Sequence, residues 1–267
     1  MSVIAQAGAK GRQLHKFGGS SLADAKCYLR VAGIMKEYSQ AGDMMVVSAA
    51  GSTTNQLISW LKLSQSDRLA AHQVQQSLRR YHTELIGGLV EPAAADTLIA
   101  AFIHDLERLA GLLDGGVSEA VYAEVVGHGE VWSARLMAAV LNQLGMEAAW
   151  LDARAFLRAE RAAQPQVDEG LSYPLLQQLM AQHPNKRLVV TGFISRNQAG
   201  ETVLLGRNGS DYSATQIGAL AGASRVTIWS DVAGVYSADP RKVKDACLLP
   251  LLRLDEASEL ARLAAPV

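Results

Sequence analysis

The six residues from Lys16 to Ser21 have the types and spacing of a site that holds phosphate groups. They read K-F-G-G-S-S and follow the short strand-like run Gln13-Leu14-His15. The lysine supplies a positive charge, Gly18 and Gly19 let backbone N–H groups approach an anion, and a helix opening from Leu22 would add its positive end. The stretch predicts a nucleotide phosphate cradle. Because it is not the P-loop pattern, a plain strand-to-helix turn is the competing interpretation.

A second segment with the same character is G-R-N-G-S-D-Y, residues 206–212. Ser210 is a good N-cap, so the free N–H groups of the following helix and the Arg207 guanidinium would converge on an anion. Asp211 in this place fits a metal ion or a substrate ammonium group beside the anion. A capped helix with a solvated salt bridge is the alternative.

Residues 230–241 follow a predicted strand and mix carboxylate, aromatic and basic groups. Asp231 is suited to accept hydrogen bonds from ribose hydroxyls, and Tyr236 is suited to pack against a base. Arg241, Lys242 and Lys244 would face phosphates. The segment is therefore a candidate nucleotide pocket, although Asp239-Pro240 by itself indicates only a turn.

Glu130 is predicted to open a helix after Gly127-His128-Gly129, where it would bind a cationic amino group. The helix dipole alone also favours a carboxylate there. Other mechanisms lack their signatures: the sequence has no H-x-x-x-H pair and no G-x-S-x-G elbow, and His128 has no evident orienting partner. No protein metal site is predicted.

The elements that must position these residues alternate between strand and helix patterns. The predicted strands cover residues 13–15, 44–48, 148–151, 187–191, 202–205 and 225–229, the fifth returning from a turn at 197–200 as a hairpin. The predicted helices cover residues 27–38, 54–61 with Thr54 as cap, 66–113 with breaks at Gly87-Gly88 and Pro92, 130–144, 210–221 and 255–265.

This alternation predicts an α/β fold with a largely parallel sheet covered by helices on both faces. In such sheets ligands bind at the carboxyl ends of the strands. The candidate segments all follow strands, at residues 16–21, 48–55, 206–212 and 230–241. We therefore expect them to meet at one edge of the sheet.

Composition narrows the class of protein. The 267 residues are 49% hydrophobic and 19% charged, with a net charge of −1, which is typical of a globular chain and argues against a nucleic-acid surface or a polybasic membrane patch. No apolar run reaches spanning length. Cys27 and Cys247 match no metal-ligand spacing and indicate thiols in a reducing compartment, so a cytoplasmic location is expected.

Three of these segments together resemble the aspartokinase signatures K-F-G-G-T-S, G-R-G-G-S-D and W-T-D-V-x-G-I-Y. They are residues 16–21, 206–211 and 229–236, in the same order along the chain. In detail, the chain resembles the N-terminal kinase portion of bifunctional aspartokinase–homoserine dehydrogenases of the methionine-linked type. Residues 13–267 would be the catalytic domain after a tail at 1–12, cut from a longer protein whose regulatory and dehydrogenase parts lie beyond Val267.

The resemblance implies the amino-acid-kinase fold, an αβα sandwich around a mostly parallel sheet. It implies transfer of the γ-phosphoryl group of ATP, with Mg²⁺, to the β-carboxylate of L-aspartate, on the pathway to methionine, threonine and lysine. Homo-oligomers are common in the family. By resemblance, catalysis belongs to Lys16, Arg207 and Asp211; substrate binding to Ser48, Thr54, Glu130, Arg207 and Ser210; and ATP binding to Lys16, Gly18, Gly19, Ser20, Ser230, Asp231, Tyr236 and Arg241.

The sequence departs from the family pattern at a few positions. Ser20 and Ser230 replace threonines, and Asn208 replaces a glycine, which suits a left-handed backbone. Pro266 stands where the family has a lysine that reaches ATP, so either Lys242 or Lys244 replaces that lysine or nucleotide binding is weaker. The alternatives are a kinase of acetylglutamate or glutamate, and a module that binds nucleotide or aspartate without turnover.

Overall fold

The computed structural model describes residues 11–240 and 242–263. They fall into two compact units, Met1–Trp229 and Ser230–Val267, and each unit is described by itself. Every strand of the sheet lies in the first unit. Arg241 and Pro266, both named from the sequence, lie outside the described residues.

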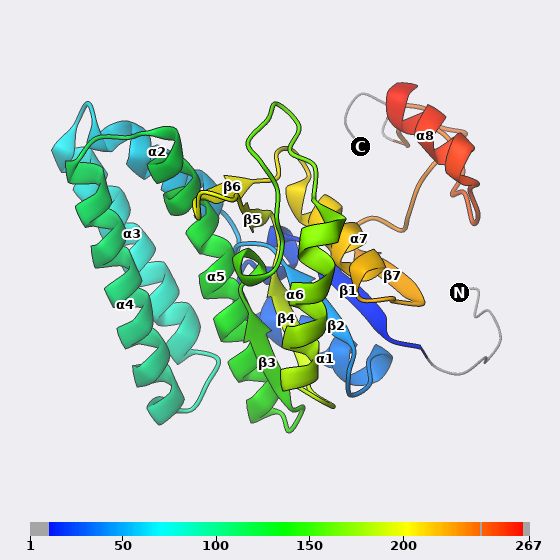
Figure 1. Cartoon of the computed structure of the whole chain (residues 1–267), viewed down its shortest axis with the longest axis horizontal. Helices are drawn as coiled ribbons and strands as arrows, with labels where there is room; N and C mark the ends of the chain where they lie inside the picture. The colour runs from blue at the N-terminus through cyan, green and yellow to red at the C-terminus, as the bar shows by residue number, and fades with distance from the viewer. Residues whose placement is uncertain (1–10, 241, 264–267) are drawn as a thin grey trace. The chain divides into compact units, whose positions relative to one another are not determined.

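The first unit is built on a five-stranded parallel sheet in the order β3-β4-β2-β1-β7 (Figure 1). The strands are β1 (Gln13–Phe17), β2 (Met44–Val47), β3 (Ala148–Leu151), β4 (Arg187–Thr191) and β7 (Arg225–Trp229). Phe17 is in register with both Val47 and Trp229, and Val47 with Thr191. Since these are the last residues of their strands, four carboxyl ends stand level at one edge of the sheet.

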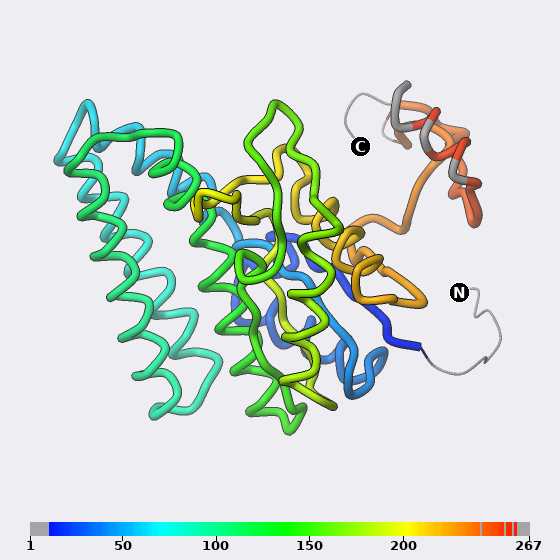
Figure 2. The backbone as a smooth tube through the Cα atoms, viewed as in Figure 1, coloured from blue at the N-terminus to red at the C-terminus, as the bar shows by residue number. Residues whose placement is uncertain are grey.

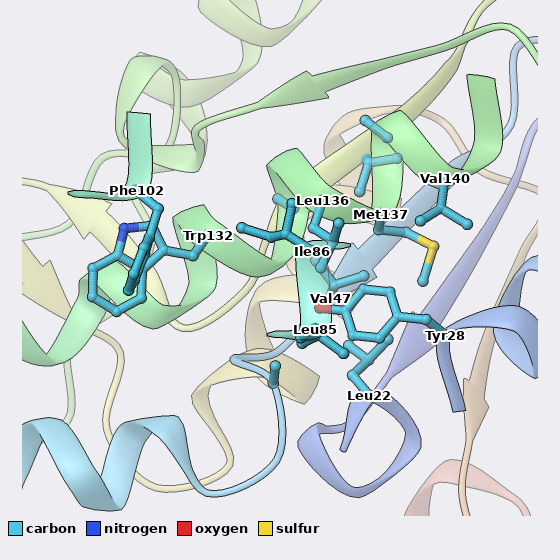
Figure 3. Close-up of a cluster of buried hydrophobic side chains, with 14 of the residues drawn as sticks. Leu22, Tyr28, Val47, Leu85, Ile86, Phe102, Trp132, Leu136, Met137 and Val140 are labelled. Carbon is cyan, nitrogen blue, oxygen red and sulfur yellow. The ribbon is translucent and has the colours of Figure 1, made fainter. Parts of the chain in front are cut away.

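Helices cover both faces of the sheet because strand residues alternate between two cores. Met45 and Val47 face α1 (Ala25–Tyr38) and α5 (Glu119–Gln143), in the core that also holds Tyr28 and Met137 (Figure 3). Met44 and Val46 face the other way, into the core of α6 (Glu169–Gln182) and α7 (Gly209–Leu220). The result is the expected αβα sandwich.

The helical layer on the α5 side is extended by α2 (Thr53–Ser64), α3 (Arg68–Gly87) and α4 (Pro92–Asp114). Only residues 88–91 join α3 to α4, so the two long helices lie antiparallel, as Figure 1 shows. Phe102 of α4 packs edge-on against Trp132 of α5, with ring centroids 4.8 Å apart. This contact joins the helical extension to the helix that covers the sheet.

Short elements connect the larger ones. A 3-10 turn, η1 (Gly19–Leu22), follows β1, and a second, η2 (Ala153–Ala155), follows β3. The hairpin of β5 (Ile194–Arg196) and β6 (Thr202–Leu204) lies outside the main sheet, as its own two-stranded antiparallel sheet. Figure 2 lets the reader follow the backbone through these connections.

In the second unit, the segments around Tyr236 and Leu248 pair in antiparallel fashion. Leu249 N–H donates to Val235 O over 2.8 Å and Ser237 N–H to Cys247 O over 2.9 Å. The helix α8 (Leu254–Leu263) follows, within the predicted range 255–265 apart from one residue at its start; Ala264 and Ala265 lie outside the described residues.

The predicted fold class is confirmed, and β3, β4 and β7 have the predicted bounds. The predicted starts of α5 and α2 were wrong, and one helix was not predicted. Helix α5 begins at Glu119, capped by Ser118, so Glu130 lies in its middle and does not open it. Helix α2 has Ser52 at its N-cap, and Thr54 is inside it. Helix α6 was not predicted, because Gly170 and Pro174 interrupt its pattern.

Across the described part of the chain, no helix combines the length and the apolar character that crossing a bilayer requires.

Candidate active site

The loops that follow β1 and β2 are bound to each other at the carboxyl edge of the sheet. Gly51 N–H donates to Gly19 O over 3.0 Å, and Ser48 N–H donates to Phe17 O over 3.1 Å. A Cβ on Gly19 would lie 2.9 Å from Ala49 O, so only glycine permits this approach. The glycines of the predicted cradle thus bring two strand-end loops into contact.

The ammonium group of Lys16 turns back over this loop. A Cβ on Gly18 would lie 3.5 Å from Lys16 Nζ, and the lysine is 8% exposed. Its Nζ lies 2.6 Å from Oδ1 of Asp211, at the start of α7. Since that oxygen has no partner with hydrogen-bond geometry within residues 11–240 and 242–263, the contact is an ion pair. The first and second predicted segments therefore meet, and a buried cation stands at the strand ends.

The turn before α7 differs from the prediction in its cap. Asn208 is the N-cap residue, with a left-handed backbone (φ 56°), and accepts the N–H groups of Asp211 and Tyr212 through its carbonyl. Ser210 is therefore inside the helix, and the prediction that it caps the helix was wrong. It packs against the loop after β4 instead, where a Cβ on Gly192 would lie 2.8 Å from Ser210 Oγ.

The start of α1 also differs from the prediction. The helix begins at Ala25, and its Asp24 cap accepts Cys27 N–H over 2.8 Å. One of the N–H groups at that positive end is therefore taken by a side chain. The residues beside the lysine form the turn η1, with Gly18 as its N-cap residue. The cradle consists of a lysine and a glycine turn, without the predicted helix opening from Leu22.

Glu130 reaches the same edge from helix α5. A Cβ on Gly129 would lie 2.8 Å from the Ala49 side chain and 3.0 Å from Thr53 Cγ2, so this glycine lets α5 press against the loop after β2. Glu130 is 2% exposed, and its Oε2 atom has no hydrogen-bond partner among the residues that the structure describes. A buried carboxyl oxygen without a partner is costly, so this position has the chemistry to accept a positive group from a ligand.

Burial raises the pKa of Glu130 to about 8. The backbone N–H groups of Ala49 and Gly192 and the positive charge of Lys16 oppose this rise in pKa but do not cancel it. Glu130 is therefore largely protonated near neutral pH in the empty protein. A bound ammonium group would favour its ionised form.

Of the remaining predicted residues of the first unit, Arg207 and Ser20 are exposed, and Ser48 and Thr54 are half-buried. Arg207 makes no ion pair or side-chain hydrogen bond within the described residues. All four follow β1, β2 or β6 and belong to the loops or helix starts described above, so their side chains are available to a ligand.

The predicted nucleotide residues Ser230, Asp231 and Tyr236 belong to the second unit. Ser230 Oγ lies 3.1 Å from Asp231 Oδ1, and Tyr236 belongs to the antiparallel pair with Leu248. Their role toward ATP stays a prediction, as does that of Arg241.

His128 lies in a charged cluster, contrary to the expectation that it has no orienting partner. Its ring nitrogens lie 3.7 Å from Asp105 Oδ1 and 3.6 Å from Glu124 Oε1. Arg154 and Thr202 also bind Glu124, at 2.8 and 2.6 Å. Two residues along a helix correspond to about 200° of rotation, so His128 and Glu130 point to nearly opposite sides of α5. We assign the cluster to helix packing.

Sequence reasoning missed the loop after β4. Gly192 contacts Ser210 and stabilises the Glu130 carboxylate, and its neighbour Phe193 has a positive φ of 65°. Such a backbone is rare for a bulky residue and clusters at functional sites. The signal that marks it is the position of both residues directly after a predicted strand.

The fold and the site together define a class. A parallel αβα sandwich has a buried lysine over a glycine turn, an aspartate paired with that lysine, and a buried glutamate, all at the strand ends. The chain belongs to the amino acid kinase family: the sequence pattern of that family matches residues 11–266.

Within that family the chain is similar to aspartokinases. It is 86% identical over all 267 residues to the bifunctional aspartokinase/homoserine dehydrogenase 2 of Escherichia coli (strain K12), of which it spans 33%. It is 34% identical over 257 residues, 95% of the chain, to the aspartokinase of Chlamydia pneumoniae, of which it spans 55%. The chain thus covers between a third and about half of these relatives.

A solved structure shows the same relationship. The crystal structure of aspartokinase III from E. coli, in complex with aspartate and ADP, superposes on 89% of this chain with a TM-score of 0.79 and 28% identity. The matched part is 53% of that chain.

Proposed function

We propose that the chain is an aspartate kinase, which transfers the γ-phosphoryl group of MgATP to the β-carboxylate of L-aspartate to give 4-phospho-L-aspartate. The observation that carries the proposal is the convergence of Lys16, Asp211 and Glu130 at one edge of the sheet. The similarity to aspartokinases, one of them bound to aspartate and ADP, supports the choice of substrates.

The phosphoryl transfer depends on alignment of the reactants and on charge stabilisation, and it does not require a general base. The β-carboxylate of aspartate, with a reference pKa of about 3.9, is already ionised at neutral pH. One of its oxygens attacks the γ-phosphorus, a new P–O bond forms, and the bond to the oxygen of the leaving ADP breaks. The obstacle is repulsion between an anion and a polyanion, so catalysis rests on alignment and charge stabilisation.

We assign the roles as follows. Lys16, over the Gly18 turn, stabilises the phosphoryl group in transfer, and Asp211 holds that ammonium in place. Glu130 binds the ammonium group of aspartate, and Arg207 its α-carboxylate. Ser48, Thr54 and Ser210 contribute hydrogen bonds to substrate.

Within the first unit, ATP is assigned to Lys16, Gly18, Gly19 and Ser20. For Ser230, Asp231, Tyr236 and Arg241 a role in ATP binding rests on the resemblance of their segment to the family signature.

Mg²⁺ fits as part of the nucleotide substrate. Within the described residues no group of three or more acidic, histidine or cysteine side chains forms a cage for a metal. Mg²⁺ in kinases is commonly held by one or two carboxylates and the phosphates, and the Asp211 side chain, 40% exposed, supplies one such carboxylate. When bound, the ion neutralises charge on the phosphates.

Trapping the acyl phosphate with hydroxylamine tests this proposal. The chain is incubated with MgATP and, separately, L-aspartate, N-acetylglutamate or glutamate. Hydroxamate should form with L-aspartate alone. Glu130 requires a free α-amino group, which excludes N-acetylglutamate, and the glutamate arm tests whether the site accepts a side chain one methylene longer. Hydroxamate from N-acetylglutamate or glutamate would indicate a sister kinase, and saturable MgATP binding without hydroxamate would indicate a binding module. A cytoplasmic location, consistent with the free cysteines Cys27 and Cys247, belongs to the same proposal.

A further inference from the structure

Two consecutive residues of α3, Tyr81 and His82, make polar contacts with the loops of the candidate site. Helix α3 belongs to the helical extension on the α5 side and contributes no predicted site residue. Tyr81 Oη donates to Ala23 O over 3.0 Å, in the segment after η1. His82 Nε2 lies 3.1 Å from Thr53 Oγ1, in the segment after β2. One helical turn of α3 is therefore bound to both strand-end loops.

The hydrogen-bond network fixes which ring nitrogen of His82 carries the proton. The Thr53 hydroxyl has a single hydrogen, and its Oγ1 lies 2.6 Å from Ala50 O, a carbonyl that only accepts. The hydroxyl donates there, so His82 must donate to Thr53 from Nε2. Burial lowers the pKa of His82 to about 3, and the ring stays neutral. His82 is a fixed neutral donor.

The rest of the packing leaves the His82 ring one orientation. It is 2% exposed and lies within 5.0 Å, centroid to centroid, of Tyr81, Phe102 and Trp132. Phe102 and Trp132 appear in Figure 3 in the same core as Ile86 of α3. Because three aromatic rings pack around it, the imidazole has little room to rotate, and its Nε2–H stays directed toward Thr53.

The contacts continue from Thr53 to the site. Thr53 packs against Gly129 of α5, and Ala49, four residues earlier, supplies a backbone N–H that stabilises the Glu130 carboxylate. On the other side, Tyr81 Oη would lie 3.0 Å from a Cβ on Gly51, whose N–H binds Gly19. The path from α3 to Glu130 and to the Gly18-Gly19 turn therefore consists of direct contacts.

We propose that His82 and Tyr81 are positioning residues of the kinase site: through Thr53 and Ala23 they hold the two strand-end loops at the spacing at which Glu130 binds L-aspartate and Lys16 meets the phosphoryl group in transfer. The inference rests on the proposed function. His82, through the loop after β2, positions Glu130, the residue assigned to bind L-aspartate. Tyr81 touches both loops. Neither residue touches substrate in this assignment.

The test compares variants that differ only in the polar contact, made in the 267-residue chain. His82→Phe keeps an aromatic ring without a donor, and His82→Gln restores an N–H donor. Tyr81→Phe removes one hydroxyl. Ile86→Val, one turn further along α3 in the same core, is the control for general weakening of the helix.

Because small displacements of a substrate-binding group have large kinetic effects, we expect His82→Phe to raise the KM for L-aspartate about tenfold. The KM for ATP should stay within about twofold. His82→Gln should recover most of the loss, Tyr81→Phe should raise the KM for L-aspartate, and Ile86→Val should not. The proposal would be overturned if the KM for L-aspartate were unchanged in His82→Phe and Tyr81→Phe, or if it rose equally in Ile86→Val. It would also be overturned if His82→Gln did not recover the loss. Should His82→Phe fail to fold, the KM values of Tyr81→Phe and His82→Gln still decide.

Hydrogen–deuterium exchange gives a readout that does not depend on activity. In His82→Phe the amides of residues 48–55 should exchange about tenfold faster, while those of β4 should not change. Uniform acceleration across the chain, or none at residues 48–55, would contradict a local positioning role. If the parent chain does not phosphorylate aspartate, the proposed function fails, and the exchange result still judges the loop contacts.

Discussion

At the scale of single residues, two ionisable side chains of the site, Lys16 and Glu130, have different surroundings. Lys16 is paired with Asp211 and lies over Gly18, which suits an ammonium that must meet phosphate oxygens. Glu130 has a buried oxygen without a hydrogen-bond partner among the described residues, which suits a side chain that binds a cationic group of a ligand. Both come from segments that a sequence reader can select, but their meeting depends on the packing of α5 and α7 against the strand ends.

Replacing Lys16 should mainly affect turnover. We expect Lys16→Ala to lower kcat at least ~100-fold, or ~2.7 kcal/mol of transition-state stabilisation, with the fold retained. Steady-state assay of ADP release measures this, and circular dichroism checks the fold. Lys36→Ala, an exposed lysine of α1, is the matched control. Near-normal turnover of Lys16→Ala would remove the lysine from its assigned role.

Glu130 should make aspartate binding depend on pH. Its pKa of about 8 in the empty site means that the carboxyl must lose a proton to bind an ammonium group. The kcat/KM for L-aspartate should therefore rise with pH and level off above about 8, since this ratio reports groups of the free enzyme. Calorimetry at pH 7 in buffers of different ionisation enthalpy should show proton release. A flat profile with no proton release would be inconsistent with this assignment.

The carboxyl group of Glu130 should also make stability depend on pH, but stability should fall as pH rises, whereas kcat/KM rises. Because the folded state holds a proton that the unfolded state loses above about 4.5, Glu130 costs stability as pH rises from about 4.5 to 8, by up to about 1.4 kcal/mol per pH unit. Glu130→Gln, which carries no charge, should be more stable than the parent at pH 9 and similar to it at pH 4.5. Urea unfolding at the two pH values measures the difference; equal differences at both would argue against a buried, protonatable Glu130.

At the scale of elements, a glycine inside α5 decides where the helix can sit. Gly129→Ala would put a methyl group 2.8 Å from the Ala49 side chain, so α5 must move away from the loop after β2. We expect a loss of about 1–3 kcal/mol in stability and a higher KM for L-aspartate. Gly33→Ala in α1 meets nothing within 4 Å and should stabilise by about 0.5–1 kcal/mol. Thermal unfolding of the two variants should move in opposite directions; a stabilised Gly129→Ala would refute the close contact.

The charged cluster between α4, α5 and η2 should govern acid stability. Burial alone would raise the pKa values of Asp105 and Glu124, but His128 and Arg135 around the first and Arg154 and Thr202 around the second lower both to about 2. Their stabilisation is present above the ordinary carboxyl pKa and is lost as pH falls from about 4.5 toward 2. Urea midpoints should drop over this range, and drop less in Glu124→Gln, which starts less stable. An equal acid drop in that variant would disprove the role of Glu124.

The sequence predicted strands better than helix ends, for physical reasons that these elements make plain. Parallel strands are short runs of mainly apolar residues, so β3, β4 and β7 could be bounded from sequence alone, even though β3 and β7 are partly exposed edge strands. Gly127 and Gly129 suggested a helix start at Glu130, but they lie inside α5, where each allows close contact with a neighbouring element. Asn208 takes the N-cap position that was assigned to Ser210, and its backbone is left-handed, a conformation that Asn adopts more readily than most residues.

At the scale of the whole first unit, the sheet unites pieces that are far apart in the chain. Lys16 and Asp211 are separated by almost two hundred residues, and their contact exists because β1 is a central strand and α7 returns to it. A sequence indicates that strand ends share an edge, as predicted, but it does not give the order β3-β4-β2-β1-β7. The contacts of Tyr81 and His82 were likewise invisible, since their helix carries no sequence motif.

The central claim is that this edge transfers a phosphoryl group from ATP to an aspartate carboxylate with Lys16 in contact. The most direct measurement is ³¹P NMR of the chain with MgATP and L-aspartate. The account predicts that the γ-phosphate signal of ATP is replaced by an acyl phosphate signal together with those of ADP, and that Lys16→Ala slows this change at least ~100-fold. Release of inorganic phosphate without an acyl phosphate, or equal rates in the parent and Lys16→Ala, would contradict it.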